Sequence, residues 1–225
     1  FKKGAEEDIT MKRLILVGLG MLMACVTRAD VDFYINAHAD DAVLFMGESL
    51  AEKVMLSAKD GNKVVLITAT AGDAGAGTGN GLGVAPNYLA REQGHNQALQ
   101  FLWGRTGAHQ AKMTSTLLKL GGKSVHRGQI QPMTNQGGLA WYSLRLPDGN
   151  LEGQGYVSTG QQSLAKLNQM QMIKITAVDQ SATYNKQELI QLLQDIVIKE
   201  GRGHKVVRVH LADQNQTGFN AGDHS

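Results

Sequence analysis

The chain has 225 residues, of which 42% are hydrophobic and 19% charged, a balance that fits one globular domain and excludes a wholly disordered chain. Its 22 basic and 20 acidic residues give a net charge of +2 without a long run of either sign, so we expect no nucleic-acid partner. The single cysteine excludes an internal disulfide framework and a four-cysteine zinc site.

Residues 11–29 have the pattern of a secretory signal peptide. A basic start at 11–13 precedes an apolar run over 14–26, and the small residue Ala29 follows it. These features are typical of a signal that is cleaved after export, so we expect a secreted or periplasmic protein. Residues 1–10, which precede a natural start methionine, are then upstream sequence or an expression scar.

Two other interpretations of this N-terminus are open. The apolar run at 14–26 could form a buried N-terminal helix, or Leu-Met-Ala-Cys at 22–25 could be a lipoprotein signal with a lipid on Cys25. Cleavage after Ala29 would leave a mature chain that starts at Asp30. That chain has no apolar run of 18 residues, so we expect no membrane span in it.

A strand, a helix and a second strand are predicted directly after the signal. Residues 31–37 are rich in β-branched and aromatic residues, which favours a strand. Residues 63–70 are almost continuously apolar, as is typical of a parallel strand covered on both faces. Between them a helix is expected from 42 to about 57, with one apolar face made of Val43, Met46, Leu50, Val54 and Leu56.

The remaining elements continue the alternation of helices and strands. They are a helix at 89–103, short strands at 113–117 and 141–146 in an otherwise irregular segment 111–156, a helix at 185–200 capped by Thr183 or Asn185, and a last strand at 206–211. This order predicts one α/β domain over 30–225. We expect a Rossmann-like three-layer sandwich with a mostly parallel sheet.

The first strand ends in a group of polar residues suited to binding a metal ion. His38, Asp40 and Asp41 follow the strand directly, and ligands of parallel sheets bind outside the carboxyl ends of the strands. We expect His38 and Asp41 to bind a divalent metal, with Asp40 available to take a proton from a bound water. Alternatively, the aspartates only cap the next helix, although capping does not explain the histidine and the second acid.

Two more polar groups follow later strands. Asp73 comes after the second strand, and Asp213 follows the last one, with Asp223 and His224 downstream. The glycine-rich loop at 72–83 has neither Gly-x-Gly-x-x-Gly nor a P-loop lysine, which disfavours a nucleotide-binding domain. The chain also lacks a Gly-x-Ser-x-Gly elbow, which disfavours a serine hydrolase.

Five segments, in the same order, resemble motifs of the LmbE-like, or PIG-L, zinc-dependent de-N-acetylases. Asn-Ala-His-Ala-Asp-Asp at 36–41 resembles the Ala-His-Pro-Asp-Asp signature of this family. The other four are the Thr-Ala-Thr-Ala-Gly-Asp-Ala-Gly loop at 68–75, Tyr-Leu-Ala-Arg-Glu-Gln at 88–93, Leu-Arg-Leu-Pro-Asp-Gly-Asn at 144–150 and Gly-Asp-His-Ser at 222–225. The resemblance implies an LmbE-like fold for the domain.

The resemblance also implies roles for individual residues. His38 and Asp41 would be metal ligands, for Zn²⁺ or another divalent transition metal, and Asp40 would be the general base. Arg91 would contact the substrate at the rim of the pocket, and Asp73 would lie on the substrate side or support the ligands. Without the resemblance, Arg91 is interpreted as a solvent-exposed helix residue that pairs with a nearby carboxylate.

The last motif resembles the start of the family's C-terminal His-x-Asp-His. In the family, the first histidine of this motif stabilises the reacting carbonyl and the second histidine is the third zinc ligand. His224 and Ser225 match the first two positions, so His224 would be catalytic and the third ligand would lie beyond Ser225. An alternative alignment makes Asp223 and His224 the final pair, with Ala221 in place of the first histidine.

The activity implied is hydrolysis of the acetamide of an N-acetylated sugar or glycoconjugate of the N-acetylglucosamine type, which releases acetate and a free amine. Two residues depart from the family pattern, Ala39 in place of proline and Ala42 in place of glutamate, and neither removes a ligand. The alternative is a non-catalytic carbohydrate-binding relative with the same fold and no metal.

Overall fold

The computed structural model describes residues 29–76, 87–107, 113–130 and 137–211. The expected signal residues 11–28 and the polar residues Asp213, Asp223 and His224 lie outside these ranges. No helix in the described ranges is long and apolar enough to cross a bilayer.

The main sheet has six strands in the order β3-β4-β5-β2-β1-β8. Strands β5, β2, β1 and β8 are parallel, and the β3–β4 hairpin adds two strands through an antiparallel pairing with β5. The predicted mostly parallel sheet is therefore confirmed. The strands are β1 (Val31–Asn36), β2 (Lys63–Thr70), β3 (Thr114–Leu120), β4 (Lys123–Ile130), β5 (Gly138–Leu146) and β8 (Val207–Leu211).

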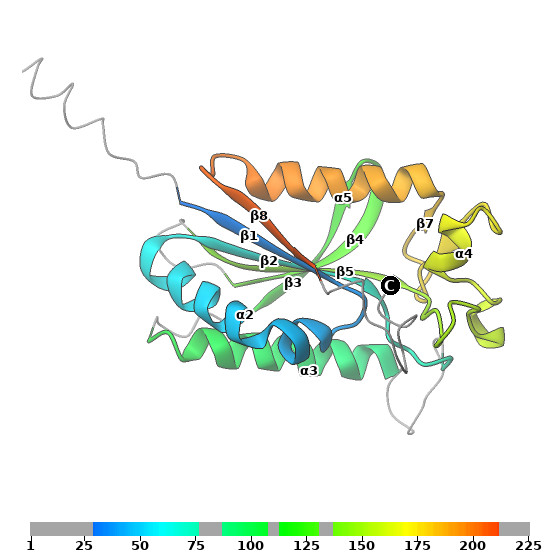
Figure 1. Cartoon of the computed structure of the whole chain (residues 1–225), viewed down its shortest axis with the longest axis horizontal. Helices are drawn as coiled ribbons and strands as arrows, with labels where there is room; N and C mark the ends of the chain where they lie inside the picture. Colours follow the sequence, from blue (N-terminus) through cyan, green and yellow to red (C-terminus); the bar gives the residue numbers. More distant parts are fainter. Residues whose placement is uncertain (1–28, 77–86, 108–112, 131–136, 212–225) are drawn as a thin grey trace, which may run out of the picture.

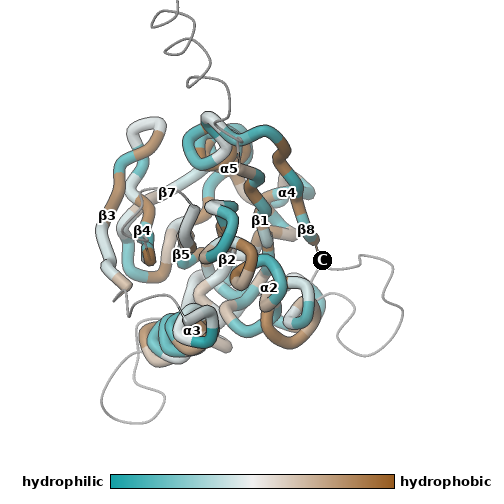
Figure 2. Tube along the Cα trace, turned by 90° about the vertical axis from the view of Figure 1, so that its left-hand side faces the viewer, coloured by the Kyte–Doolittle hydropathy of each residue, from teal (hydrophilic) through white to brown (hydrophobic). Residues whose placement is uncertain are grey.

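Helices cover both faces of this sheet (Figure 1). Helix α5 (Lys186–Gly201) lies on one face, and α2 (Asp41–Asp60) and α3 (Asn87–Gly104) lie on the other. Figure 2, turned by 90°, shows the strands between these two helical layers. The chain is thus an α/β sandwich of three layers, compatible with a Rossmann-like fold.

Alternation along the central strands produces a separate hydrophobic core on each face of the sheet. Phe33 and Ile67 pack with Leu192 of α5 in one core, while Tyr34 and Leu66 pack in the other core with residues of α2 and α3. Successive side chains of a strand point to opposite faces, so both faces of a central strand are apolar when both are covered. This explains the nearly continuous apolar sequence of β2.

Helix α2 is interrupted near its start. Met46 has φ −128° and ψ 17°, which are not helical angles, so the first turn is rotated relative to the rest of the helix. Leu50 and Val54 are buried as predicted, but Val43 is 40% exposed. The expectation that Val43 shares their packing face is therefore wrong, because the kink breaks the helical spacing between them.

The segment predicted to be irregular contains more sheet than expected. Strands β3 and β4 form a hairpin through the turn at Gly121 and Gly122, and β5 starts three residues earlier than the predicted strand at 141–146. Strand β4 was missed because its sequence, Lys-Ser-Val-His-Arg-Gly-Gln-Ile, is mostly polar. Pairing with β5 on one side and β3 on the other forms this strand despite its polar sequence.

Short elements lie beyond the carboxyl ends of the parallel strands, on the right of Figure 1. They are the 3-10 turn η1 (Val157–Thr159), helix α4 (Leu164–Asn168) and the small β6–β7 sheet (Ile175–Thr176 and Thr183–Tyr184). The chain then enters α5, where Asn185 is the N-cap, one of the two residues proposed for that position.

Candidate functional site

A cavity of about 340 Å³ lies at the carboxyl ends of β1 and β5. It combines acidic, basic and apolar side chains from the turn after β1, the start of α2, helix α3 and the loop after β5. The residues that line it are His38, Asp40, Asp41, Leu44, Phe45, Ala74, Arg91, Asp148, Asn150, Leu151 and Tyr156. Four of the site residues predicted from the sequence therefore line the same cavity: His38, Asp40, Asp41 and Arg91.

The turn between β1 and α2 holds His38 and Asp41 against each other. The backbone N–H of His38 donates to Asp41 Oδ2 at 2.8 Å, and His38 Nδ1 lies 3.6 Å from Asp41 Oδ1. Asn36 holds the turn in place, because its side-chain amide donates hydrogen bonds to the His38 carbonyl and to Thr68 Oγ1 of β2. Both His38 and Asp41 are buried. The turn thus presents one imidazole nitrogen and one carboxylate oxygen side by side.

A second carboxylate, from Asp148, faces the other side of the His38 ring. Its Oδ2 lies 3.8 Å from His38 Nε2 and accepts the backbone N–H of Ala74, while its Oδ1 accepts the N–H of Asn150. No role was predicted for Asp148 from the sequence. Asp148 follows the apolar strand β5 as His38 follows β1, and this position at a strand end marks it as a candidate. Its approach to His38, however, depends on where β5 lies relative to β1, which the sequence does not show.

Asp73 lies behind the cavity rather than on its wall. Its side chain is fully buried, and Oδ1 accepts the backbone N–H of Asp148 at 3.1 Å. Asp73 therefore fixes the loop that carries Asp148 and acts on the site through that residue.

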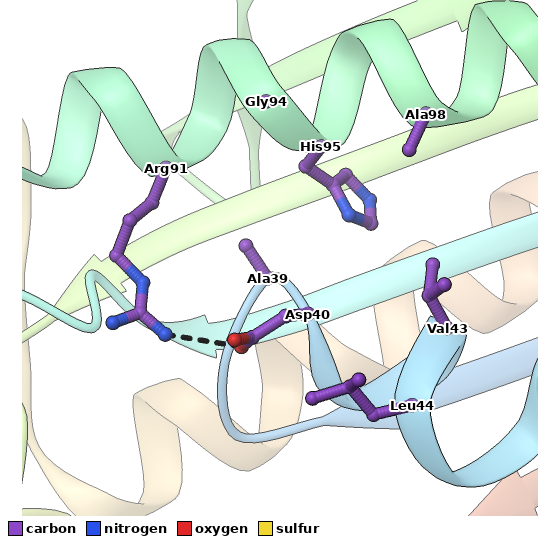
Figure 3. Close-up of a pocket in the computed structure, with 8 residues that line it drawn as sticks. All are labelled: Ala39, Asp40, Val43, Leu44, Arg91, Gly94, His95 and Ala98. Carbon is purple, nitrogen blue, oxygen red and sulfur yellow. Dashed lines mark hydrogen bonds and ion pairs between the residues drawn. The ribbon is translucent and has the colours of Figure 1, made fainter.

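Arg91 reaches across from α3 to Asp40. Its Nη2 donates to Asp40 Oδ1 at 3.0 Å, and both side chains are partly open to solvent (Figure 3). Gly72 makes room for this arrangement: a Cβ at that position would lie 3.0 Å from Arg91 Nε and 3.4 Å from His38 Cδ2. With a φ of +56° as well, the position favours glycine both sterically and conformationally.

The described residues offer two close donors for a metal ion rather than a full set. His38 and Asp41 supply nitrogen and oxygen, which suit Zn²⁺. Two donors about 2.1 Å from a tetrahedral ion lie about 3.4 Å apart, close to the 3.6 Å between His38 Nδ1 and Asp41 Oδ1. In the ranges that the structure describes, no group of three His, Cys, Asp or Glu side chains is arranged to hold a metal. The expected His224 position lies outside those ranges.

Comparisons of the chain with family models, with curated proteins and with solved structures found no match.

Proposed function

We propose that this cavity hydrolyses the acetamide of an N-acetylated sugar with the help of a divalent metal ion, preferably Zn²⁺, held by His38 and Asp41. The observation that carries the proposal is the buried pair of His38 Nδ1 and Asp41 Oδ1, 3.6 Å apart, in the same cavity as the more exposed Asp40. The LmbE-like resemblance of the turn supports the same assignment.

The metal would supply Lewis acidity, which lowers the pKa of a bound water from about 15.7 to about 7. Asp40 lies at the cavity wall and is held in one orientation by Arg91. In the proposed reaction its carboxylate accepts the proton of the attacking water and passes it to the amide nitrogen, which leaves as an amine. His224 is proposed to stabilise the oxyanion of the reacting carbonyl.

The rest of the cavity suits a polar ligand of the size of a sugar. Its volume of about 340 Å³ falls in the range of small-molecule sites, roughly 300–1,000 Å³. Arg91 and Asn150 on its wall can donate hydrogen bonds to hydroxyl groups, and Asp148 can accept them. The Tyr156 ring provides an apolar surface for the face of a pyranose.

Replacement of Asp40 by Asn tests the assignment of the base. In the full-length protein, D40N should lower the rate of acetate release from N-acetylglucosamine by about 10²–10⁴-fold, because the amide cannot accept the proton. Zinc content per chain should not change, since Asp40 is not a proposed ligand. The matched control is E48Q, a loss of an exposed carboxylate on α2, which should retain wild-type activity.

Two results would reject parts of this proposal. Wild-type turnover by D40N would exclude Asp40 as the base. A wild-type protein that binds N-acetylglucosamine but holds no zinc and releases no acetate would instead be the non-catalytic carbohydrate-binding relative. Elemental analysis together with an acetate assay separates these cases.

A further inference from the structure

A cluster of charged side chains between α3 and the sheet joins three separate segments of the chain. The Arg145 guanidinium of β5 donates from Nε to Glu92 Oε1 at 2.7 Å and from Nη2 to Glu92 Oε2 at 2.6 Å. Its Nη1 donates to Asp179 Oδ2 at 2.6 Å, in the loop between β6 and β7. The Arg145 and Glu92 side chains are only 11% and 13% exposed. Arg145 therefore connects α3 to the carboxyl end of β5 and to the β6–β7 loop.

Several contacts define the position of the Arg145 guanidinium. An arginine that donates two parallel hydrogen bonds to one carboxylate is fixed in direction as well as in distance. The Tyr88 ring, in the first turn of α3, lies 5.1 Å from Arg145 Cζ, and Ser143 donates a further hydrogen bond to Glu92. Arg145 has a φ of +53°, which is uncommon for a residue with a Cβ, at an irregularity in the pairing of β5 with β2. Such conformations persist where surrounding contacts hold them, and they cluster at functional sites.

Glu92 precedes this cluster in α3 by no more than one peptide bond from Arg91, so the cluster also determines where the Arg91 side chain starts. Neighbouring residues of a helix point in directions about 100° apart. Glu92 can therefore face β5 while Arg91 faces Asp40 (Figure 3).

The Arg91–Asp40 ion pair is too exposed to set its own geometry. The two side chains are 38% and 53% exposed, and ion pairs between solvent-exposed side chains contribute little energy by themselves. The 3.0 Å contact between Arg91 Nη2 and Asp40 Oδ1 thus depends mainly on where α3 lies relative to the turn after β1. The buried Glu92–Arg145 pair is the contact that fixes α3 at this level.

We propose that Glu92 and Arg145 are positioning residues for the cavity that contains His38 (the main cavity), because their ion pair holds α3 where Arg91 can bind Asp40. Neither side chain is part of the cavity lining, so they act on the reaction through Arg91. The inference rests on the proposed function, in which Arg91 orients the carboxylate of the base.

A double-mutant cycle in the full-length protein tests this role. Glu92→Gln removes the negative charge at nearly constant size. It should lower the rate of acetate release from N-acetylglucosamine about 10- to 100-fold, since small misplacements of orienting groups have effects of this order. In the Arg91→Ala background the same substitution should change the rate by less than about twofold, because its effect passes through Arg91.

The matched control is Glu200→Gln. Glu200 is also buried and paired with two cations, Lys63 and Arg127, but Lys63 starts β2 and so lies at the opposite end of the sheet from the main cavity. E200Q should therefore retain the wild-type rate although it also loses a buried charge.

A second measurement detects the Arg91 side chain directly and needs no turnover. The nitrogen–proton NMR signal of Arg91 Nε is assigned by its loss in Arg91→Lys, and Asp40→Ala gives its position without the ion pair. E92Q and Arg145→Lys should both move this signal towards its position in D40A, and E200Q should leave it in place. Lysine at 145 keeps the positive charge but cannot donate two parallel hydrogen bonds, so R145K carries the comparison if E92Q does not fold.

Three results would overturn the inference. They are rate losses of E92Q and R91A that multiply in the double variant, an equal rate loss in E200Q, or an Arg91 signal that stays at its wild-type position in E92Q and R145K. Circular dichroism establishes that each variant is folded. The proposed hydrolysis can fail independently. If the wild type releases no acetate but E92Q and R145K still move the Arg91 signal, the positioning of Arg91 stands and only the catalytic proposal is lost.

Discussion

At the scale of single residues, the burial of His95 makes the stability of the fold depend on pH. The ring is buried among α3, the turn at Ala39 and the ring of Trp141, whose centroid lies 4.6 Å away. Its pKa is about 4 in the folded protein and about 6.5 when the chain is unfolded. Between these values the unfolded chain binds more protons than the folded one. Stability due to the neutral ring is therefore complete above pH 6.5 and is lost as the pH falls towards 4.

Replacement of His95 by Leu should remove this pH dependence. We expect the loss of unfolding free energy between pH 7 and 4 to be smaller in H95L than in the wild type, by a value on the order of 3 kcal/mol. Urea unfolding at pH 7, 5.5 and 4 measures it. If both proteins lose the same free energy over this range, His95 is not the group responsible.

The residues of the main cavity were predictable to different degrees. His38, Asp40 and Asp41 are adjacent in the sequence, so their clustering follows from one turn. Asp148 is more than a hundred residues away from them, and its approach to His38 depends on β5 lying beside β2 and β2 beside β1. Arg91 faces Asp40 only because α3 packs next to α2.

At the scale of elements, α5 has the most complete local signals. The Asn185 side chain accepts the backbone N–H of Glu188, and the Glu188 side chain accepts the N–H of Asn185, which forms a capping box. Leu192 and Ile196 bury one face of the helix against the sheet. Both signals are local in sequence, which is why this helix could be predicted within one residue at each end.

Loss of the cap should destabilise the protein. Asn185→Ala should lower the free energy of unfolding by about 1 kcal/mol, because the backbone N–H of Glu188 at the start of α5 loses its acceptor. The control Gln187→Ala, on the exposed side of the first turn, should change it by less than about 0.5 kcal/mol. Chemical unfolding at pH 7 compares the variants, and equal stability of N185A and Q187A would show that the cap contributes nothing.

At the scale of the whole molecule, Glu200 joins α5 to three strands of the sheet. Its carboxylate is buried and accepts from Tyr142 of β5, Lys63 of β2 and Arg127 of β4. Burial alone would raise the pKa of Glu200, but the charge and hydrogen bond of Lys63, the hydrogen bond of Tyr142 and the charge of Arg127 hold it below its usual value. Glu200 is thus a buried charged contact between α5 and the sheet, in addition to the apolar contacts of the core and the Lys123–Glu188 ion pair.

Removing the charge of Glu200 should lower the free energy of unfolding more than removing an exposed charge does. Glu200→Gln should lower the unfolding free energy by about 3 kcal/mol, because Lys63 and Arg127 would lose a shared anion. Glu52→Gln, in which the lost side chain is mostly exposed, should change it by less than about 1 kcal/mol. Urea unfolding at pH 7 measures both. Similar values for the two variants would contradict the role given to Glu200.

The sequence by itself determined the α/β class, the parallel central strands and the polar turn at residues 38–41. These features depend on apolar periodicity and on neighbours within a few residues, which the sequence records directly. The tertiary structure alone decided the pairing of the polar strand β4, the exposure of Val43 just before the kink at Met46, and the approach of Asp148 and Arg91 to the turn. Each of these depends on which elements pack side by side, because contacts between distant segments are set by the fold as a whole.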